Sequence, residues 1–333
     1  MKVSVRVYFP HMARIRVGVL RGGPSSEYDV SLKTGASVLE HLGEDKYQPI
    51  DMLVDKSGQW HVNGFPFEEA NAARQMDVIV NALHGRYGED GTVQRILDTV
   101  GVPYTGSDSL ASAVAFNKAL TKHTLYGSDI KMAPHIAVEL DPNVEQKLLR
   151  IFRSFPFPAV VKPVADGSSV GVSVASTFDE LLDAAEKAFQ LSPKILIEEY
   201  IKGREATCGV VEGFRGEELY AFFPTEIIPA TTSRFFDYDA KYGGDSQEIC
   251  PGNFMPEEKR EIQRMAKLAH QRLGLRHYSR SDFIVSPRGI YFLEVNTLPG
   301  LTSESLLPKA IKAAGSSLQH FLDHLIQLAM RKA

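Results

Sequence analysis

The stretch Phe292 to Ser305, FLEVNTLPGLTSES, places a carboxylate and an amide at the end of an apolar run. Glu294 and Asn296 are two positions apart, and side chains at such positions of a strand point to the same face. Their oxygen atoms are hard donors that can converge on one divalent cation. The spacing therefore predicts a metal site where this strand ends.

The segment before it, SRSDFIVSPRG, predicts a partner strand and a hairpin. A three-residue loop, PRG, ends in Gly289 in the left-handed conformation and sets the register of the two strands. Asp282 then lies opposite Glu294, and Arg280 lies opposite Asn296, with all four on one face. That face would present three oxygen ligands with a guanidinium beside them.

Three apolar residues are predicted on this same face, Ile284, Ile290 and Phe292. The alternative interpretation is a polar face exposed to water, without a site. The apolar neighbours weaken that alternative because they indicate a face that is partly covered.

A second motif, VVKPVADGSSVGVS, places Lys162 at the end of a strand, before a turn rich in glycine and serine. Backbone N–H groups and hydroxyls of such a turn can cover phosphate oxygens while the lysine supplies charge. The lysine precedes the glycines and no helix follows, so this is not a Walker A loop. A hairpin turn without a ligand is the alternative.

Two N-terminal motifs follow apolar strands, where ligands bind in parallel sheets. In VLRGGPSSEYDVS a helix begins after two glycines and can bind an anion, while the absence of GxGxxG argues against a dehydrogenase. Glu27 either caps this helix or holds an ammonium group. In NALHGRYGEDGT, His84 is either a structural histidine or part of a site. Lys118, considered by itself, is a surface lysine.

Composition limits the class of protein. The chain has 333 residues, 44% hydrophobic and 23% charged, as in globular proteins of two or three domains. A net charge of -4 argues against nucleic-acid binding, and no apolar run is long enough for a membrane span. The first residues lack a signal-peptide pattern, and Cys208 and Cys250 have no metal-binding spacing. We therefore expect a reduced, cytoplasmic protein.

The order of apolar segments indicates an α/β fold in three domains. Residues 1–115 alternate strands and helices, which predicts βαβ units and a parallel sheet. Residues 116–204 form a central domain, and residues 205–333 form a third, in which GEELYAFFPTEI is expected as one strand. Residues from about 231 to 251 are polar and without expected regular structure, which is typical of a functional lid.

Together these motifs resemble those of the ATP-grasp amide ligases, and among them the D-alanine:D-alanine ligases. The resemblance runs from about Arg16 to Ala329 and is carried by seven motifs in the family's order: GGPSSEYDVS, ALHGRYGEDG, PYTGS, KP-x3-GSSVG, DYDAKY, RSD and LEVNTLPG-x-TSES. It implies an ATP-grasp fold with an N-terminal parallel-sheet domain. It also implies that ATP phosphorylates the carboxylate of one D-alanine and that the amine of a second attacks the acyl phosphate, giving the dipeptide for peptidoglycan synthesis.

The resemblance implies roles for the hairpin residues. Asp282, Glu294 and Asn296 would hold two Mg2+ ions, with Mn2+ as a substitute, between the phosphates and the reacting carboxylate. Arg280 and the backbone N–H of Gly300 would stabilise the oxyanion of the tetrahedral intermediate.

For ATP, the resemblance implies that Lys118 and Lys162 contact phosphates and that Glu205 binds the ribose hydroxyls. The strand edge that receives adenine would be Glu198, Glu199, Tyr200 and Ile201. For the amino acids, Glu27 would hold the first ammonium group, with His84 nearby, and the second carboxylate would be contacted by Lys241 and Ser305.

The lid is assigned in the same way, because Ser168 and Tyr242 match a pair that closes over the site by hydrogen bonding with Glu27. Closure would exclude water from the acyl phosphate, and Tyr242 favours an amine as second nucleophile. Two alternatives stay open: a different second substrate, D-serine or D-lactate, and a non-catalytic binder of nucleotide or amino acid. Glu304 beside Ser305 would repel an incoming carboxylate, and relatives are commonly homodimers.

Overall fold

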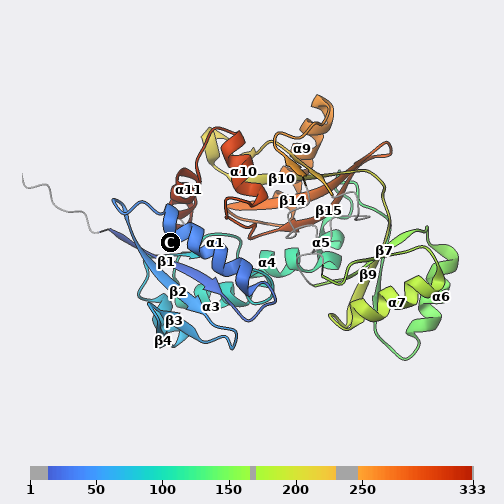
Figure 1. The fold of residues 1–333 in the computed structure, drawn as a ribbon, viewed down its shortest axis with the longest axis horizontal. Helices are drawn as coiled ribbons and strands as arrows, with labels where there is room; N and C mark the ends of the chain where they lie inside the picture. The colour runs from blue at the N-terminus through green and yellow to red at the C-terminus, as the bar shows by residue number, and fades with distance from the viewer. Residues whose placement is uncertain (1–13, 166–169, 230–246, 332–333) are drawn as a thin grey trace, which may run out of the picture.

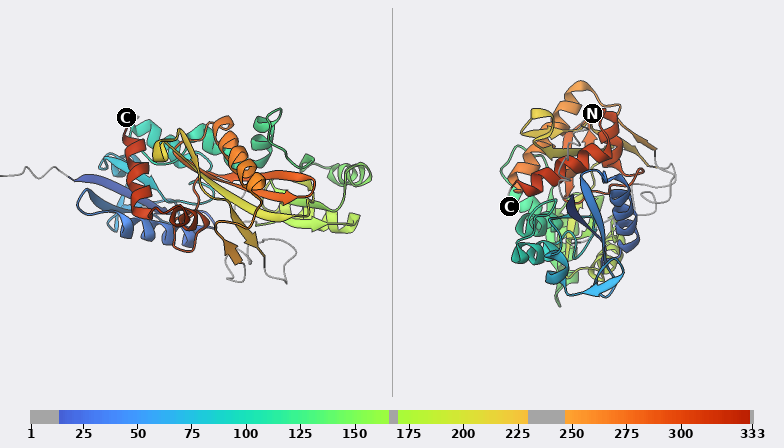
Figure 2. Two further views of the ribbon diagram at one scale, coloured as in Figure 1. Left: turned by 90° about the horizontal axis from the view of Figure 1, so that it is seen from above. Right: turned by 90° about the vertical axis from the view of Figure 1, so that its left-hand side faces the viewer.

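The computed structural model describes residues 14–165, 170–229 and 247–331. Over these ranges the molecule is elongated, with the N-terminal sheet at one end and the sheet of the central segment at the other (Figure 1, Figure 2). The C-terminal sheet lies between them. Within the described ranges, no helix combines the length and the apolar character that crossing a bilayer would require.

The N-terminal sheet is built around three parallel strands, β1 (Ile15–Gly22), β2 (Tyr47–Val54) and β5 (Val78–Asn81). β5 is buried along its whole length, as is typical of a parallel strand covered on both faces. Helix α1 (Tyr28–His41) packs against β1, and α3 (Thr92–Val100) follows β5 in the chain. The predicted parallel sheet is confirmed for these three strands.

The same sheet continues as an antiparallel hairpin that the sequence analysis did not include. β3 (Trp60–Val62) pairs with β2, β4 (Phe65–Phe67) pairs with β3, and α2 (Glu69–Ala73) follows. The turn residues Asn63 and Gly64 both have positive φ, as a two-residue type I′ turn requires. The hairpin makes the sheet mixed at this edge, which the sequence analysis did not include, and the NG dipeptide was the available signal.

The central segment forms a four-stranded antiparallel sheet in the order β6-β9-β7-β8. Two helices cover one of its faces and supply its apolar core. α7 begins at a capping box formed by Thr177 and Glu180, a local signal that fixes where this helix starts. The elements are β6 (His135–Glu139), α6 (Val144–Ser154), β7 (Ala159–Pro163), β8 (Ser173–Ala175), α7 (Phe178–Phe189) and β9 (Lys194–Glu199).

The C-terminal sheet is antiparallel, in the order β13-β12-β10-β14-β15, with β11 also paired to β10. Its apolar face is covered by α9, which contacts β10, β11, β14 and β15. The elements are β10 (Arg204–Glu212), the 3-10 helix η1 (Phe214–Gly216), β11 (Leu219–Ala221), β12 (Thr225–Ile228), β13 (Gln247–Ile249), α9 (Pro256–Arg272), β14 (Tyr278–Ser286) and β15 (Gly289–Asn296).

Two expectations for this sheet are wrong. GEELYAFFPTEI does not form one strand, because pairing stops after β11 and resumes at Thr225. Pro224 lies in that gap and has no N–H group to donate to a ladder. The polar segment expected to lack regular structure contains β13, which pairs with β12, whereas its residues 230–246 lie outside the described part of the chain.

Helix α5 (Lys118–Leu125), which follows α4 (Ser109–Phe116), lies between the central and C-terminal sheets (Figure 1). Asn117 caps it by accepting a hydrogen bond from the Leu120 N–H at 3.0 Å. The backbone N–H of Lys118 donates to the carbonyl of Val164, just after β7. The start of α5 is thus fixed to the central sheet.

Helices α10 (Leu306–Ala313) and α11 (Leu318–Met330) return the chain to the N-terminal sheet, where α11 packs against α1 and β5. Val17 and Val80 belong to the same buried cluster as Phe321 and Leu325. The first sheet and the last helices therefore share one core, which brings the loop before α10 close to α1.

Candidate active site

Strands β14 and β15 bring the predicted hairpin face together. Asp282 is paired with Glu294, and Arg280 with Asn296, as the sequence predicted. Arg280 donates to Asp282 through two contacts of 3.1 Å, from Nε to Oδ1 and from Nη2 to Oδ2. Thr207 of β10 donates its hydroxyl to the same Oδ1 at 2.5 Å. Neighbours within the sheet thus fix the orientation of both charged groups.

The register changes directly after Asp282, where a β-bulge inserts Leu293 into β15. Ser286 pairs with Gly289, so the turn has two residues and the predicted three-residue loop is wrong. Gly289 does have the predicted positive φ, 113°, but as the first residue of β15.

The bulge also corrects the predicted apolar face. Ile284 lines the cavity beside Asp282, as predicted. Phe292 is instead fully buried with Phe283 in the core under α9, and Ile290 packs against the same core. One inserted residue reverses the alternation of a strand, so the side chains on either side of it face opposite ways.

The hairpin face closes one wall of a cavity of about 330 Å³ between the central and C-terminal sheets. The other walls come from β7 and β9 on one side and from β10 and β12 on the other, with Lys118 of α5 reaching in. All four residues of the predicted adenine edge line it, as do Lys162 and Glu205. The structure therefore gathers around one space residues that are far apart in the sequence.

Glu198 is almost fully buried and pairs with two lysines. Its Oε1 lies 2.7 Å from Nζ of Lys122, and its Oε2 lies 2.6 Å from Nζ of Lys162. Burial by itself would raise the pKa of Glu198, but the two ammonium groups outweigh it and lower the pKa to about 2. Sequence analysis missed Lys122, although its spacing of one helical turn from Lys118 was a usable signal.

Lys118 is not an ordinary surface lysine. Its Nζ lies 3.3 Å from Oε2 of Glu294, and only 13% of its side chain is exposed. Helix α5 therefore carries one lysine to the hairpin face and another to Glu198.

Of the remaining residues of the predicted adenine edge, only Glu199 is charged. Glu199 pairs with Arg288 of the hairpin turn, with Nη2 and Oε2 at 3.1 Å. This pairing lowers the pKa of Glu199 and ties the central sheet to the hairpin. Tyr200 and Ile201 follow β9, while Glu205 faces the cavity from β10, opposite Ile227.

The predicted metal ligands are compatible with Mg2+. Asp282 and Glu294 supply carboxylate oxygens from directly opposed positions, and Asn296 supplies an amide oxygen that already accepts the Leu298 N–H at 2.9 Å. An amide oxygen has a second lone pair, so it can still bind a cation. Among the described residues no group of three or more His, Cys, Asp or Glu could hold a metal. Three hard oxygen donors beside this cavity suit an ion that takes its other ligands from phosphates and water.

Glu27 and His84 lie together on the N-terminal side. Glu27 occupies the N-cap position of α1, but its side chain makes no capping hydrogen bond. A Cβ built on Gly85 would lie 2.8 Å from Oε2 of Glu27, so this carboxylate faces the loop that follows β5. His84 is 5% exposed and its Nε2 lies 2.8 Å from the hydroxyl of Thr34.

The loop before α10 completes this side. Ser305 is the N-cap of α10, and its Oγ lies 2.8 Å from Oγ1 of Thr302. A Cβ added at Gly300 would lie 2.8 Å from Oγ of Ser305 and 4.0 Å from Oγ1 of Thr34, the partner of His84. Gly300 and Ser305 are therefore neighbours of the Glu27 and His84 region. The other predicted site residues, Ser168, Lys241 and Tyr242, lie outside the described residues.

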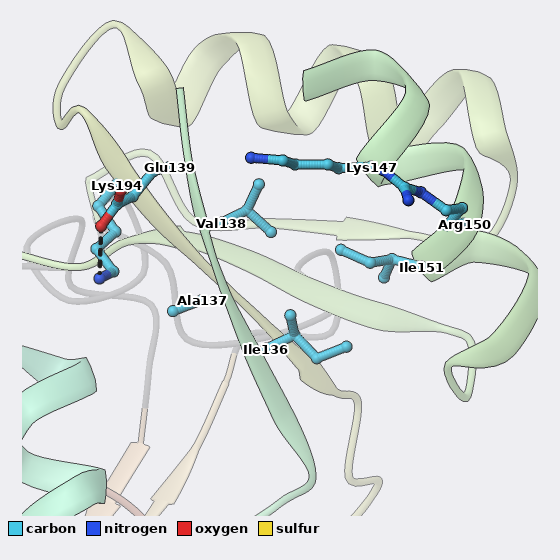
Figure 3. A pocket seen from close by; sticks show the side chains of 8 residues that line it. All are labelled: Ile136, Ala137, Val138, Glu139, Lys147, Arg150, Ile151 and Lys194. Atoms are coloured by element: carbon cyan, nitrogen blue, oxygen red, sulfur yellow. Dashed lines mark hydrogen bonds and ion pairs between the residues drawn. The ribbon is translucent and has the colours of Figure 1, made fainter. Parts of the chain in front are cut away.

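A second hollow, of about 400 Å³, lies on the outer edge of the central sheet between β6 and α6 (Figure 3). Lys147 projects over Val138, Arg150 lies nearer Ile151, and Lys194 pairs with Glu139 at the margin of the hollow. None of the described residues that the sequence predicted for the site lines it. The hollow is therefore separate from the cavity that the β14–β15 hairpin lines.

Comparison with known proteins gives the same family from sequence and from structure. Residues 16–72 and 63–107 match the model of the D-ala D-ala ligase N-terminus, and residues 125–327 match that of the C-terminus. The D-alanine–D-alanine ligase of Syntrophobacter fumaroxidans is 40% identical over 318 residues, covering 95% of this chain and 98% of the relative.

Two solved structures extend the comparison. The VanG D-Ala:D-Ser ligase from Enterococcus faecalis has a TM-score of 0.84 at 30% identity, covering 95% of this chain and 99% of that one. The D-alanine–D-alanine ligase from Bacillus anthracis complexed with ATP has a TM-score of 0.77 at 31% identity, covering 96% and 98%. The chain belongs to the D-alanine–D-alanine ligase family and has its ATP-grasp fold.

Proposed function

We propose that the cavity between the central and C-terminal sheets binds ATP and that the hairpin face carries out the ligation. The chain is an ATP-dependent ligase that joins two D-alanines for peptidoglycan synthesis. The observation that carries the placement is the convergence of Lys118, Lys162, Arg280, Asp282 and Glu294 around one cavity. A binder without catalysis would not need metal ligands, phosphate lysines and an oxyanion group together.

In this proposal the nucleotide lies across β9 and β10. Lys118 and Lys162 bind the phosphates, and Glu205 binds the ribose hydroxyls. The edge from Glu198 to Ile201 receives adenine, and because the buried Glu198 carboxylate pairs with Lys122, this residue contributes through its backbone. The Bacillus anthracis relative complexed with ATP supports ATP as the nucleotide.

Two Mg2+ ions, for which Mn2+ could substitute, would be held by Asp282, Glu294 and Asn296 and would neutralise charge on the transferring phosphoryl group. Arg280, fixed by Asp282, stabilises the oxyanion that forms when the second amine attacks. The N–H of Gly300 assists it, and the glycine allows Ser305 to approach this backbone closely.

The amino acids are proposed on the N-terminal side. Glu27 holds the ammonium group of the first D-alanine, because its carboxylate faces the loop that follows β5, and His84 is fixed in that loop by Thr34. Ser305 and Lys241 contact the second carboxylate. The lid consists of about residues 231–251. Ser168 and Tyr242 close it over the site by hydrogen bonding with Glu27, which would keep water from the acyl phosphate.

The test is phosphate release from Mg-ATP with D-alanine, with the product identified by mass. D-alanyl-D-alanine with one phosphate per dipeptide is the expected result. D-serine and D-lactate are assayed alongside, because the structurally similar VanG enzyme is a D-Ala:D-Ser ligase. Preference for either as second substrate would correct the assignment of acceptor, and no phosphate release with any of them would favour a binding protein.

We further propose the division into domains 1–115, 116–204 and 205–333, a cytoplasmic location, and a homodimer. Size-exclusion chromatography with light scattering tests the dimer directly.

A further inference from the structure

Lys122 lies beside the nucleotide cavity but is not among the residues that line it. Its side chain is 0% exposed, and its ammonium group lies 2.7 Å from Oε1 of Glu198. An ammonium group is unfavourable in a protein interior unless it is paired, so packing alone does not explain a lysine here.

Glu198 holds two lysines on separate oxygens. Lys122 is on Oε1, at the closed side, and Lys162 is on Oε2, at the side that faces the cavity. Burial lowers the pKa of Lys122 from its ordinary value, and the Glu198 carboxylate opposes that shift. Because only Lys162 of the two lysines lines the cavity, it is the one that can turn toward an anion there.

If Lys162 were the only partner of Glu198, its movement to a phosphate would leave a buried carboxylate unpaired, which is strongly unfavourable. We propose that Lys122 is a positioning residue that stays paired with Glu198 and so frees Lys162 to bind a phosphate of ATP. This inference rests on the proposed function, which places the phosphates at Lys118 and Lys162.

Helix α5 gives Lys122 the fixed position that this role requires. Asn117 caps the helix, and one turn before Lys122 the side chain of Lys118 reaches Glu294 at 3.3 Å. The two lysines, four positions apart, lie on the same side of the helix. The same helix thus positions Lys118, which is proposed to bind a phosphate, and Lys122, which stays paired with Glu198 when Lys162 moves.

The test measures the Kd of Mg2+-AMPPNP by isothermal titration calorimetry without D-alanine, so that the readout is independent of turnover. Lys122→Met should weaken binding about tenfold or more, because Lys162 is then retained by Glu198. Lys194→Met is the matched control, since this lysine pairs with Glu139 on the exposed edge of the same sheet. Its Kd should change less than about twofold.

Adding Glu198→Gln separates positioning from a merely structural role. In the double variant Lys122→Met/Glu198→Gln no carboxylate competes for Lys162, so the Kd should return to within about threefold of wild type. An unchanged Kd in Lys122→Met, or a double variant that binds as weakly as the single one, would overturn the inference. A loss of thermal stability alone would not reproduce the recovery.

If Lys122→Met does not fold, Glu198→Gln is compared with the double variant instead. Removal of Lys122 should then change the Kd by less than about threefold, and a larger loss overturns the inference. Lys162→Met tests the underlying site. If it leaves the Kd unchanged, the proposed nucleotide site itself is wrong, whereas a loss there with none in Lys122→Met rejects only the role of Lys122.

Discussion

The two sides of the candidate site are built by different means. The proposed nucleotide side is a network of ion pairs between side chains, with distances from 2.6 to 3.3 Å. Its lysines come from one helix and one strand, and its carboxylates from two different sheets. We define it as Lys118, Lys122, Lys162, Glu198 and Glu294.

The proposed substrate side, defined as Glu27, His84, Gly300 and Ser305, depends instead on hydroxyls and on close approach of loops. Thr34 of α1 connects its two halves, because it bonds to His84 and lies near Gly300. A binding site for phosphates needs charge, whereas a site for a small amino acid needs shape and oriented hydrogen bonds. Loss of a charge should therefore harm the first side most, and added volume the second.

The largest loss of turnover is expected from substitutions in the β14–β15 hairpin, which carries the proposed metal ligands. Glu294→Ala removes a proposed metal ligand and the partner of Lys118, so turnover should fall about a thousandfold or more at ordinary Mg2+. Asn296→Ala should lower turnover to a similar extent. Dipeptide formation is measured on protein whose fold is checked by circular dichroism, and turnover like wild type would remove the metal assignment.

Gly300→Ala tests shape on the substrate side. The new methyl group would meet Oγ of Ser305, so Ser305 must move, and kcat/KM for D-alanine should fall about 10- to 100-fold. The KM for ATP should not change. Ser303→Ala, an exposed position of the same loop, is the control. A rise in the KM for ATP of similar size would show that the two sides are not separable in this way.

Acid should weaken the ion-pair network. The folded pKa of Glu198 is about 2, below its ordinary 4.5, so its contribution to stability is present above pH 4.5 and is lost as the pH falls toward 2. The full contribution is on the order of 3 kcal/mol. The difference in Tm between wild type and Glu198→Gln should thus shrink from pH 5 to pH 3. A constant difference would mean that Glu198 is not held as a carboxylate by its lysines.

The smallest effect is expected from Glu304→Ala. The sequence suggested that this carboxylate repels the second substrate, but its side chain is 86% exposed and Lys309 lies 3.6 Å away. Water and this lysine screen its charge, so the KM for D-alanine should change less than about twofold. A fall of tenfold in KM would place Glu304 on the substrate side after all.

Local sequence predicted much of this molecule correctly. The apolar runs predicted β1, β2 and β5, and the spacing of Glu294 and Asn296 predicted a shared face, because both features follow from the period of a strand. The resemblance supplied the family, which the matched models confirm. The missed hairpin after β2 was also readable, from its NG turn.

Long-range packing decided the rest. The burial of Lys122 and the pairing of β13 with β12 depend on elements that are not adjacent in the chain. Considered by itself, Lys118 looked like a surface residue because its partner Glu294 lies on β15, far along the chain. The sequence by itself determined which residue types were available and their local period. Only the tertiary structure decided which charges meet, because an ion pair depends on distance in space rather than along the chain.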